Sequence, residues 1–166
     1  MLRIIADSTC DISKEDARKM GIQIVPISVR FGNEEFLDGV EITHEEFYTR
    51  LAECDELPKT SQPSPDTFMK VFNEAVAAGD DVLGIFISSD LSGTYQSACL
   101  AALDVEEETG KKLYMVDSRS ASIGTALLIR EAVKLRDAGV NAADIAAACT
   151  GCLLYTSPSP RDKRQS

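Results

Sequence analysis

The sequence predicts an α/β fold, a three-layer domain in which helices flank a mostly parallel β-sheet. Short runs rich in β-branched residues alternate along the chain with stretches of helical periodicity, the pattern of βα units around a parallel sheet. Residues 82–87 are apolar throughout, as expected of a central strand that is covered on both faces. A chain of about 150 residues buries roughly two-thirds of its unfolded surface, which favours a single domain.

The N-terminal residues predict a strand followed by a helix. Residues 2–6 are apolar apart from Arg3 and read as the first strand. Ser13 then stands where a helix cap is expected, with Asp16 at the third helical position. This pair predicts the start of the first helix.

A β-hairpin is predicted next. Residues 24–31 alternate between apolar and polar side chains, Gly32-Asn33 turns the chain, and residues 34–37 return. Pro26 indicates an edge or a bulge in the first strand, because proline has no N–H to donate.

Two capping patterns predict the following helices. Thr43 and Glu46 form a capping box, which starts a helix over residues 44–53. Ser64-Pro65-Asp66 combines a cap, a first-turn proline and an acid, and predicts a helix that ends at Gly79.

The second half of the chain continues the alternation of strands and helices. After the strand at residues 82–87, Ser92 opens a helix, and residues 113–116 form another buried strand. A long helix follows over residues 122–138 and stops at Gly139.

Charge and composition exclude several classes of protein. The 166 residues include 27 acidic and 17 basic side chains, a net charge of −10, so binding to nucleic acid is not expected. No run approaches the roughly 18 to 20 apolar residues of a transmembrane helix, and Asp7 comes too early for a signal peptide. Five cysteines, an odd number, are typical of reduced thiols, so we expect a cytoplasmic protein.

The C-terminal residues differ in character from the rest of the chain. Residues 1–150 are expected to form the folded domain and residues 151–166 a disordered tail, because two Ser-Pro steps oppose helix there. Residues 152–162 look like translated adapter or vector sequence, which would make the tail non-native and place the end of the native reading frame near residue 150. A natural basic tail is the alternative.

Three polar segments are candidates for a binding site, at residues 7–11, 60–65 and 88–95. In an open α/β sheet, ligands bind beyond the carboxyl ends of the strands. Residues 88–95 couple a buried strand to a helix start through hydroxyls and a glycine, which suits a carboxylate or a phosphate. The alternative is that Ser92 simply caps the helix, and that Asp7 and Asp11, as acids at a strand end, just cap the next helix.

Enzymatic signatures are weak. His44 is the single histidine and stands in the first turn of a predicted helix, and no nucleophile elbow or nucleotide-binding glycine motif occurs. A phosphoryl-transfer or hydrolytic enzyme that uses Asp7, Asp11 or His44 remains the alternative function. A third reading is an interaction fragment whose acidic surface binds a basic partner.

Five segments together resemble the N-terminal domain of the DegV family, bacterial fatty-acid-binding proteins. The resemblance covers residues 1 to about 148, and the joint occurrence of two Ser/Thr motifs makes it specific. The segments are IIADSTCD at 4–11, VPI at 25–27, TSQPSP at 60–65, SSDLSGTYQSA at 88–98 and DSRSASIG at 117–124.

The resemblance implies a two-domain protein that holds one fatty acid between its domains, of which the C-terminal domain is absent here. Relatives are nearly twice as long, so this chain is expected to be a fragment that binds the acid weakly. The resemblance places the carboxylate against the hydroxyl loops. The implied site residues are Thr60, Ser61, Ser92, Gly93 and Thr94, with Asp7, Ser8 and Ser118 in supporting positions.

The resemblance also implies the function. Such a protein is a carrier without catalysis of its own, which presents the carboxylate to a separate ATP-binding fatty-acid kinase that makes acyl phosphate for phospholipid synthesis. No metal and no cofactor are expected. The expected partners are a long-chain fatty acid and the kinase, with transient contact to a membrane surface as a further option.

Overall fold

Four parallel strands form the main sheet of the protein, in the order β2-β1-β6-β7. The structure is a computed structural model and describes residues 1–54 and 56–154, without the side chains of residues 152–154. In the register, Ile4 of β1 pairs with Ile22 of β2 and with Leu83 of β6, and Leu83 pairs with Tyr114 of β7. The strands are β1 (Leu2–Asp7), β2 (Ile22–Val25), β6 (Asp81–Phe86) and β7 (Tyr114–Asp117).

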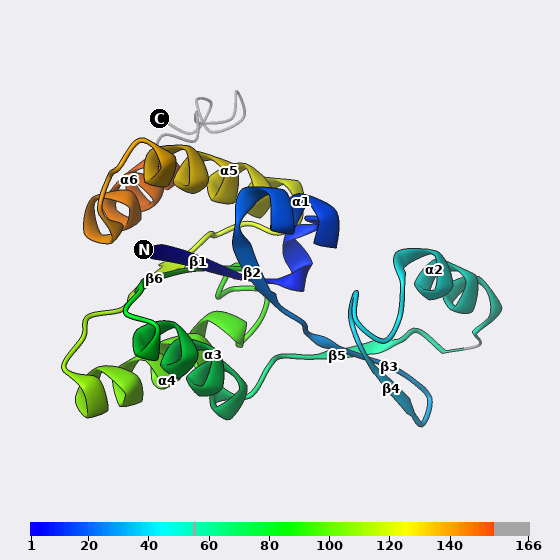
Figure 1. Cartoon of the computed structure of the whole chain (residues 1–166). Coiled ribbons are helices and arrows are strands. Elements are labelled where there is room, and N and C mark those ends of the chain that lie inside the picture. Colours follow the sequence, from blue (N-terminus) through cyan, green and yellow to red (C-terminus); the bar gives the residue numbers. More distant parts are fainter. Residues whose placement is uncertain (55, 155–166) are drawn as a thin grey trace, which may run out of the picture.

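Helices cover both faces of this sheet, which confirms the predicted three-layer α/β class (Figure 1). Side chains alternate along each strand, so Ile4 and Leu83 point into one core and Ile5 and Val82 into the other. The first core packs against α1 (Lys14–Met20), α5 (Ile123–Asp137) and α6 (Ala142–Leu154). The second packs against α3 (Pro65–Ala77) and α4 (Thr94–Thr109).

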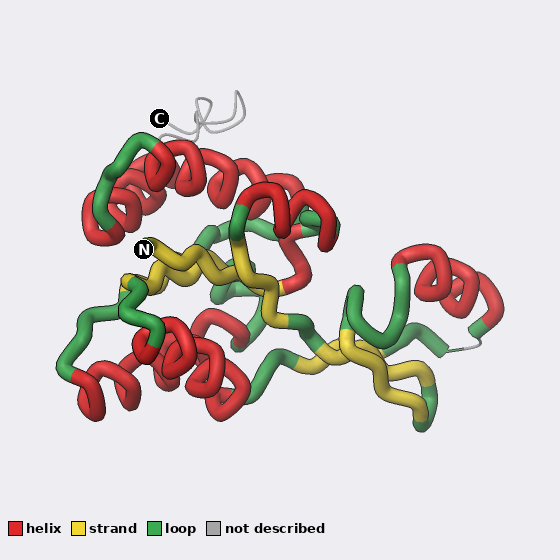
Figure 2. The backbone as a smooth tube through the Cα atoms, viewed as in Figure 1, coloured by secondary structure: helices red, strands yellow, loops and turns green. Residues whose placement is uncertain are grey.

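A second, smaller sheet extends to one side of the main sheet (Figure 2). It is antiparallel, in the order β4-β3-β5, and packs with α2 around Val29, Phe31 and Ile42. We call residues 28–61, which contain these elements, the small unit. Its elements are β3 (Ser28–Phe31), β4 (Glu34–Leu37), α2 (His44–Glu53) and β5 (Lys59–Ser61).

The predicted helix caps are confirmed. The Ser13 and Ser64 side chains accept hydrogen bonds from the third amide of α1 and α3. Thr43 and Glu46 form both halves of the capping box of α2. The caps were predictable because each lies within four residues of its partner.

The strand predicted at residues 24–31 is divided between the two sheets. Residues before Pro26 pair with β1 as β2, and residues after Ile27 form the hairpin with β4, which confirms the hairpin but not a single strand. The Ile27 amide donates instead to the Ser8 hydroxyl, at 3.2 Å. Pro26 therefore marks a crossing between sheets, because its missing N–H ends the ladder there.

Two other boundaries differ from the prediction. The N-cap of α4 is Gly93 rather than Ser92, and the helix begins at Thr94. α6 continues to Leu154, beyond the boundary expected at residue 150. The expectation that residues 155–166 are a disordered, non-native tail falls on residues outside those that the structure describes. None of the described helices is both long enough and apolar enough to span a bilayer.

Candidate functional site

Asp7 joins the two central strands at their carboxyl ends. Its side chain is fully buried, and Oδ1 accepts hydrogen bonds from the Thr9 amide, at 2.9 Å, and from the Thr9 hydroxyl. Oδ2 accepts from the Ile87 amide, at 2.8 Å. Both oxygens are thus engaged by backbone of the β1 and β6 loops, so Asp7 shapes this edge of the sheet.

The loop after β7 is fixed in a similar way. Asp117 accepts hydrogen bonds from the Ser89 hydroxyl, at 2.6 Å, and from the Arg119 amide, at 2.8 Å. The Ser118 hydroxyl is fully buried and bonds to Thr125 Oγ1, at 3.0 Å. Ser118 therefore points into the packed interior, where it supports the loop.

Backbone strain is concentrated at the same edge. Among the described residues, the non-glycine residues with positive φ are Asp11 (54°), Arg119 (46°) and Ser122 (53°). The Ser122 hydroxyl bonds to the Asp11 carboxylate, and the Ser122 amide donates to the Thr9 carbonyl, at 3.0 Å. Such conformations persist where the surrounding structure enforces them, and they cluster at functional sites.

The N-terminus of α4 offers amides to an anion. Gly93 is the N-cap and has no side chain, so it makes no capping hydrogen bond of its own. Ser92 Oγ lies 2.9 Å from Thr94 Oγ1 and accepts from the Thr94 amide, at 3.3 Å. Ser92 and Gly93 are half-buried and Thr94 is fully buried, so the serine and glycine form the accessible part. The first amides and the positive end of the helix dipole favour a negative charge there.

Thr60 and Ser61 come from the small unit. They form the exposed strand β5, where Thr60 pairs with Val29 and Ser61 with Ser28. The sequence predicted a loop here, because the three residues of β5 carry no apolar alternation. Pairing with β3 is what makes them a strand.

Gln62 connects β5 to α4 and was missed from the sequence. Its Nε2 donates to Ser97 Oγ, at 3.1 Å, in the first turns of α4. Its amide group also lies against Gly93, where an added Cβ would overlap Oε1 and come within 2.8 Å of Cδ and Nε2. The contact brings the Thr60–Ser61 strand to the start of α4, so the two predicted Ser/Thr segments are neighbours.

Two adjoining cavities lie between the main sheet and the small unit. The smaller, about 250 Å³, includes Thr60 in its lining, and the larger is a groove of about 670 Å³. Both are lined by Ser8, Asp38 and His44, so they are adjacent. Ser92, Gly93 and Thr94 line neither cavity. The apolar lining of the groove consists of Ile12, Ala17, Ile22, Ile24, Pro26 and Val40.

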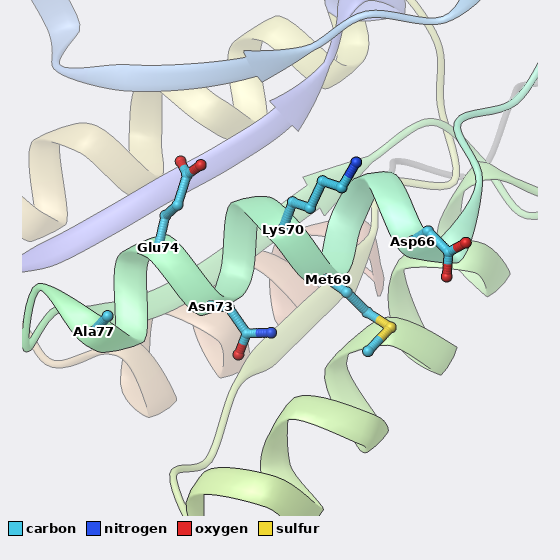
Figure 3. A pocket seen from close by; sticks show the side chains of 6 residues that line it. All are labelled: Asp66, Met69, Lys70, Asn73, Glu74 and Ala77. Carbon is cyan, nitrogen blue, oxygen red and sulfur yellow. The ribbon is translucent and has the colours of Figure 1, made fainter.

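A third hollow, about 660 Å³, lies along α3. Its lining comes from this helix alone, and Figure 3 shows Lys70 and Glu74 extending from one side and Asn73 and Met69 from the other. The polar groups do not converge, so this hollow lacks the geometry of a binding site.

Burial disfavours the ionised forms of two thiols and a phenol in this region. Burial raises the pKa of the Cys10 thiol to about 11, so it is protonated at neutral pH. Burial also raises the pKa of Tyr95 to about 12 and that of Cys99 above its usual value. No group of three or more His, Cys, Asp or Glu suited to a metal ion occurs among residues 1–54 and 56–154.

Comparison with known proteins decides the family. A family model described as "Uncharacterised protein, DegV family" matches residues 1–152. The chain belongs to the DegV family. The resemblance drawn from the Ser/Thr motifs is thereby confirmed. A DegV domain-containing protein of Clostridium perfringens is 40% identical over 144 residues, which are 87% of this chain and 50% of the relative. The chain thus spans about half the length of the curated relatives that it matches.

Solved DegV structures share the fold and bind fatty acids. A stearic acid-binding protein of Eubacterium ventriosum has a TM-score of 0.83 and 35% identity over 90% of this chain and 52% of its own. A fatty-acid-binding DegV family protein of Thermus thermophilus has a TM-score of 0.80 and 34% identity, over 92% and 54%. The Fatty Acid Kinase (Fak) B3 protein of Streptococcus pneumoniae, loaded with linoleic acid, has a TM-score of 0.77 and 25% identity, over 92% and 54%.

Proposed function

We propose that this DegV chain is a fatty-acid-binding protein that captures the carboxylate of a long-chain fatty acid without catalysing a reaction. The observation that carries the proposal is the start of α4, whose N-cap Gly93 has no capping side chain, beside the Thr60–Ser61 strand. Ser92, Gly93 and the helix amides after that of Thr94 supply donors there, and Thr60 and Ser61 carry exposed hydroxyls on opposite faces of the neighbouring strand β5. Such donors at a helix start suit a carboxylate.

Electrostatics favours the α4 start over the smaller cavity as the position of the carboxylate. Asp11 and Asp38 line that cavity. A fatty-acid carboxylate among them would face two like charges, which disfavour a further ionised group. We therefore place the carboxylate on the Ser92 side of Thr60, away from Asp11 and Asp38.

The apolar groove is the surface of this chain best suited to the acyl tail. Each buried methylene contributes roughly 0.8 kcal/mol, so about 14 fully buried methylenes would contribute on the order of 11 kcal/mol before ordering costs. A contact with the helix end contributes about 0.3 to 2 kcal/mol. The tail sets the affinity and the hydroxyls set the orientation. A tail half-covered by this chain alone would gain about 5 kcal/mol, so we expect binding weaker than micromolar.

The biological role that we propose is delivery of the fatty acid to an ATP-binding kinase. The name of the Streptococcus pneumoniae relative supports this, because that protein belongs to a fatty acid kinase. The odd number of cysteines is consistent with a cytoplasmic carrier.

The test is a titration with palmitate and with the fatty alcohol of the same length. Alanine at both Thr60 and Ser92 should weaken palmitate binding about tenfold and leave binding of the alcohol unchanged, because only palmitate has the charged group. Thr67→Ala, at the start of α3, is the matched control, because Thr67 is exposed and lies outside the proposed site. Equal palmitate affinity in the double variant and the unaltered chain would refute the assignment.

A second candidate function rests on one observation. Asp11 and His44 line the same cavity, as a hydrolytic or phosphoryl-transfer enzyme would require. Asp7 is unsuited to that role because backbone amides occupy both of its oxygens. Turnover of an aryl ester or aryl phosphate that His44→Ala abolishes would support the enzymatic function. Absence of turnover would leave the carrier as the proposed function.

A further inference from the structure

We propose that Gln62 is the positioning residue of the carboxylate site, holding the Thr60–Ser61 strand at a set distance from the start of α4. The inference rests on the proposed function and assigns a role to a side chain that itself need not touch the ligand. Its basis is the hydrogen bond from Gln62 to Ser97 together with the packing of the same amide on Gly93.

The hydrogen bond has a fixed anchor. Ser97 is only 4% exposed and lies on α4, whose inner face is buried in the core of the main sheet. Gln62 itself is exposed and follows directly after β5. The bond therefore fixes a surface segment to a helix that cannot shift without disturbing that core.

Gly93 makes the close approach possible. Its φ of −75° is open to any residue, so the backbone angle does not call for glycine at this position. The available space does call for glycine, because a Cβ would occupy the volume of the Gln62 amide group. An alanine at this position should push Gln62 away and break its bond to Ser97.

The location of the contact explains its importance. Two linkers connect the small unit to the rest of the fold, residues 26–27 after β2 and residues 62–64 before α3. One hydrogen bond that involves a side chain crosses at each linker, from the Ile27 amide to Ser8 just after β1 and from Gln62 to Ser97 of α4. The Gln62 bond is the one beside Thr60, so it sets the separation between the hydroxyls of β5 and the amides of α4. Misplacing such groups by a fraction of an ångström weakens a bound ligand's hydrogen bonds.

The experiment measures two properties of the full chain. Hydrogen exchange should become faster at residues 59–64 in Gln62→Ala and in Gln62→Met, which keeps the length of the side chain but loses the donor. Gln96→Ala is the matched control, because Gln96 is an exposed glutamine in the first turn of the same helix. Unchanged exchange at residues 59–64 in both Gln62 variants would overturn the proposal.

Ligand titration then separates positioning from general destabilisation. Gln62→Ala should bind palmitate about five- to tenfold more weakly and the matching fatty alcohol equally well, whereas loss of structure would weaken both. Gly93→Ala should show the same pattern, and the double variant should be no weaker than Gly93→Ala alone, since both changes remove one contact. Additive losses, or equal losses for both ligands, would overturn the positioning role.

If the unaltered chain bound neither ligand, the proposed function and the positioning role would fail together. The exchange measurement would still decide whether the Gln62 contact holds β5.

Discussion

Replacement of Asp7 by alanine tests whether this carboxylate holds the carboxyl edge of the sheet together. The change removes the acceptor of the Ile87 amide, which is buried, and of the Thr9 amide, which is half-buried. A buried donor left without a partner costs about 1 to 3 kcal/mol. Two such donors, one partly open to water, give an expected loss of about 3 kcal/mol in the free energy of unfolding.

Urea unfolding followed by circular dichroism measures this loss. With a slope of about 1.5 kcal/mol per molar urea, the midpoint should fall by about 2 M. Asp7→Asn keeps one side-chain oxygen as an acceptor, so its urea midpoint should fall by about half as much. Asp90→Ala is the control, because Asp90 is an exposed acid in the loop after β6. A midpoint for Asp7→Ala within about 0.3 M of that of the unaltered chain would refute the structural role.

Three further predictions concern the core, a cap and an ion pair. Phe68→Ala should lower the free energy of unfolding by about 3 to 5 kcal/mol, because Phe68 is fully buried and packs against Phe86 with ring centroids 5.2 Å apart; urea unfolding checks this. Thr43→Ala should cost α2 about 1 kcal/mol and speed hydrogen exchange within that helix alone, which mass spectrometry would detect. The Arg3 hydrogen bond and that of the N-terminal amino group lower the pKa of Asp80, so its stabilisation is present above the unfolded pKa of about 3.9 and is lost as pH falls through the folded value. The difference in urea midpoint between the unaltered chain and Asp80→Asn should therefore be constant near pH 7 and shrink below about pH 4.

The sequence predicted those parts of the fold that depend on nearby residues. The caps at Ser13, Thr43 and Ser64 bond to amides three positions further along, so their motifs carry the information. The apolar run of β6 is likewise a local signal in the sequence, because both faces of that strand are covered.

The features that were missed depend on residues far apart in the chain. The division at Pro26 follows from β2 pairing with β1 and β3 pairing with β5, which periodicity alone does not distinguish. Gln62 meets its partner Ser97 across 35 positions, and Gly93 replaces Ser92 as the N-cap where the Gln62 amide packs. A glycine beside a predicted helix start was the only local signal of that contact.

The pairing of β1 with β6 has a consequence for synthesis on the ribosome. Leu2 faces Asp81, so the first strand emerges long before its central neighbour exists. β3, β4 and β5, by contrast, are complete once residue 61 has left the exit tunnel. A nascent chain would therefore hold an unpaired edge of β1 until β6 has been translated, which is the interval in which a chaperone would act on it.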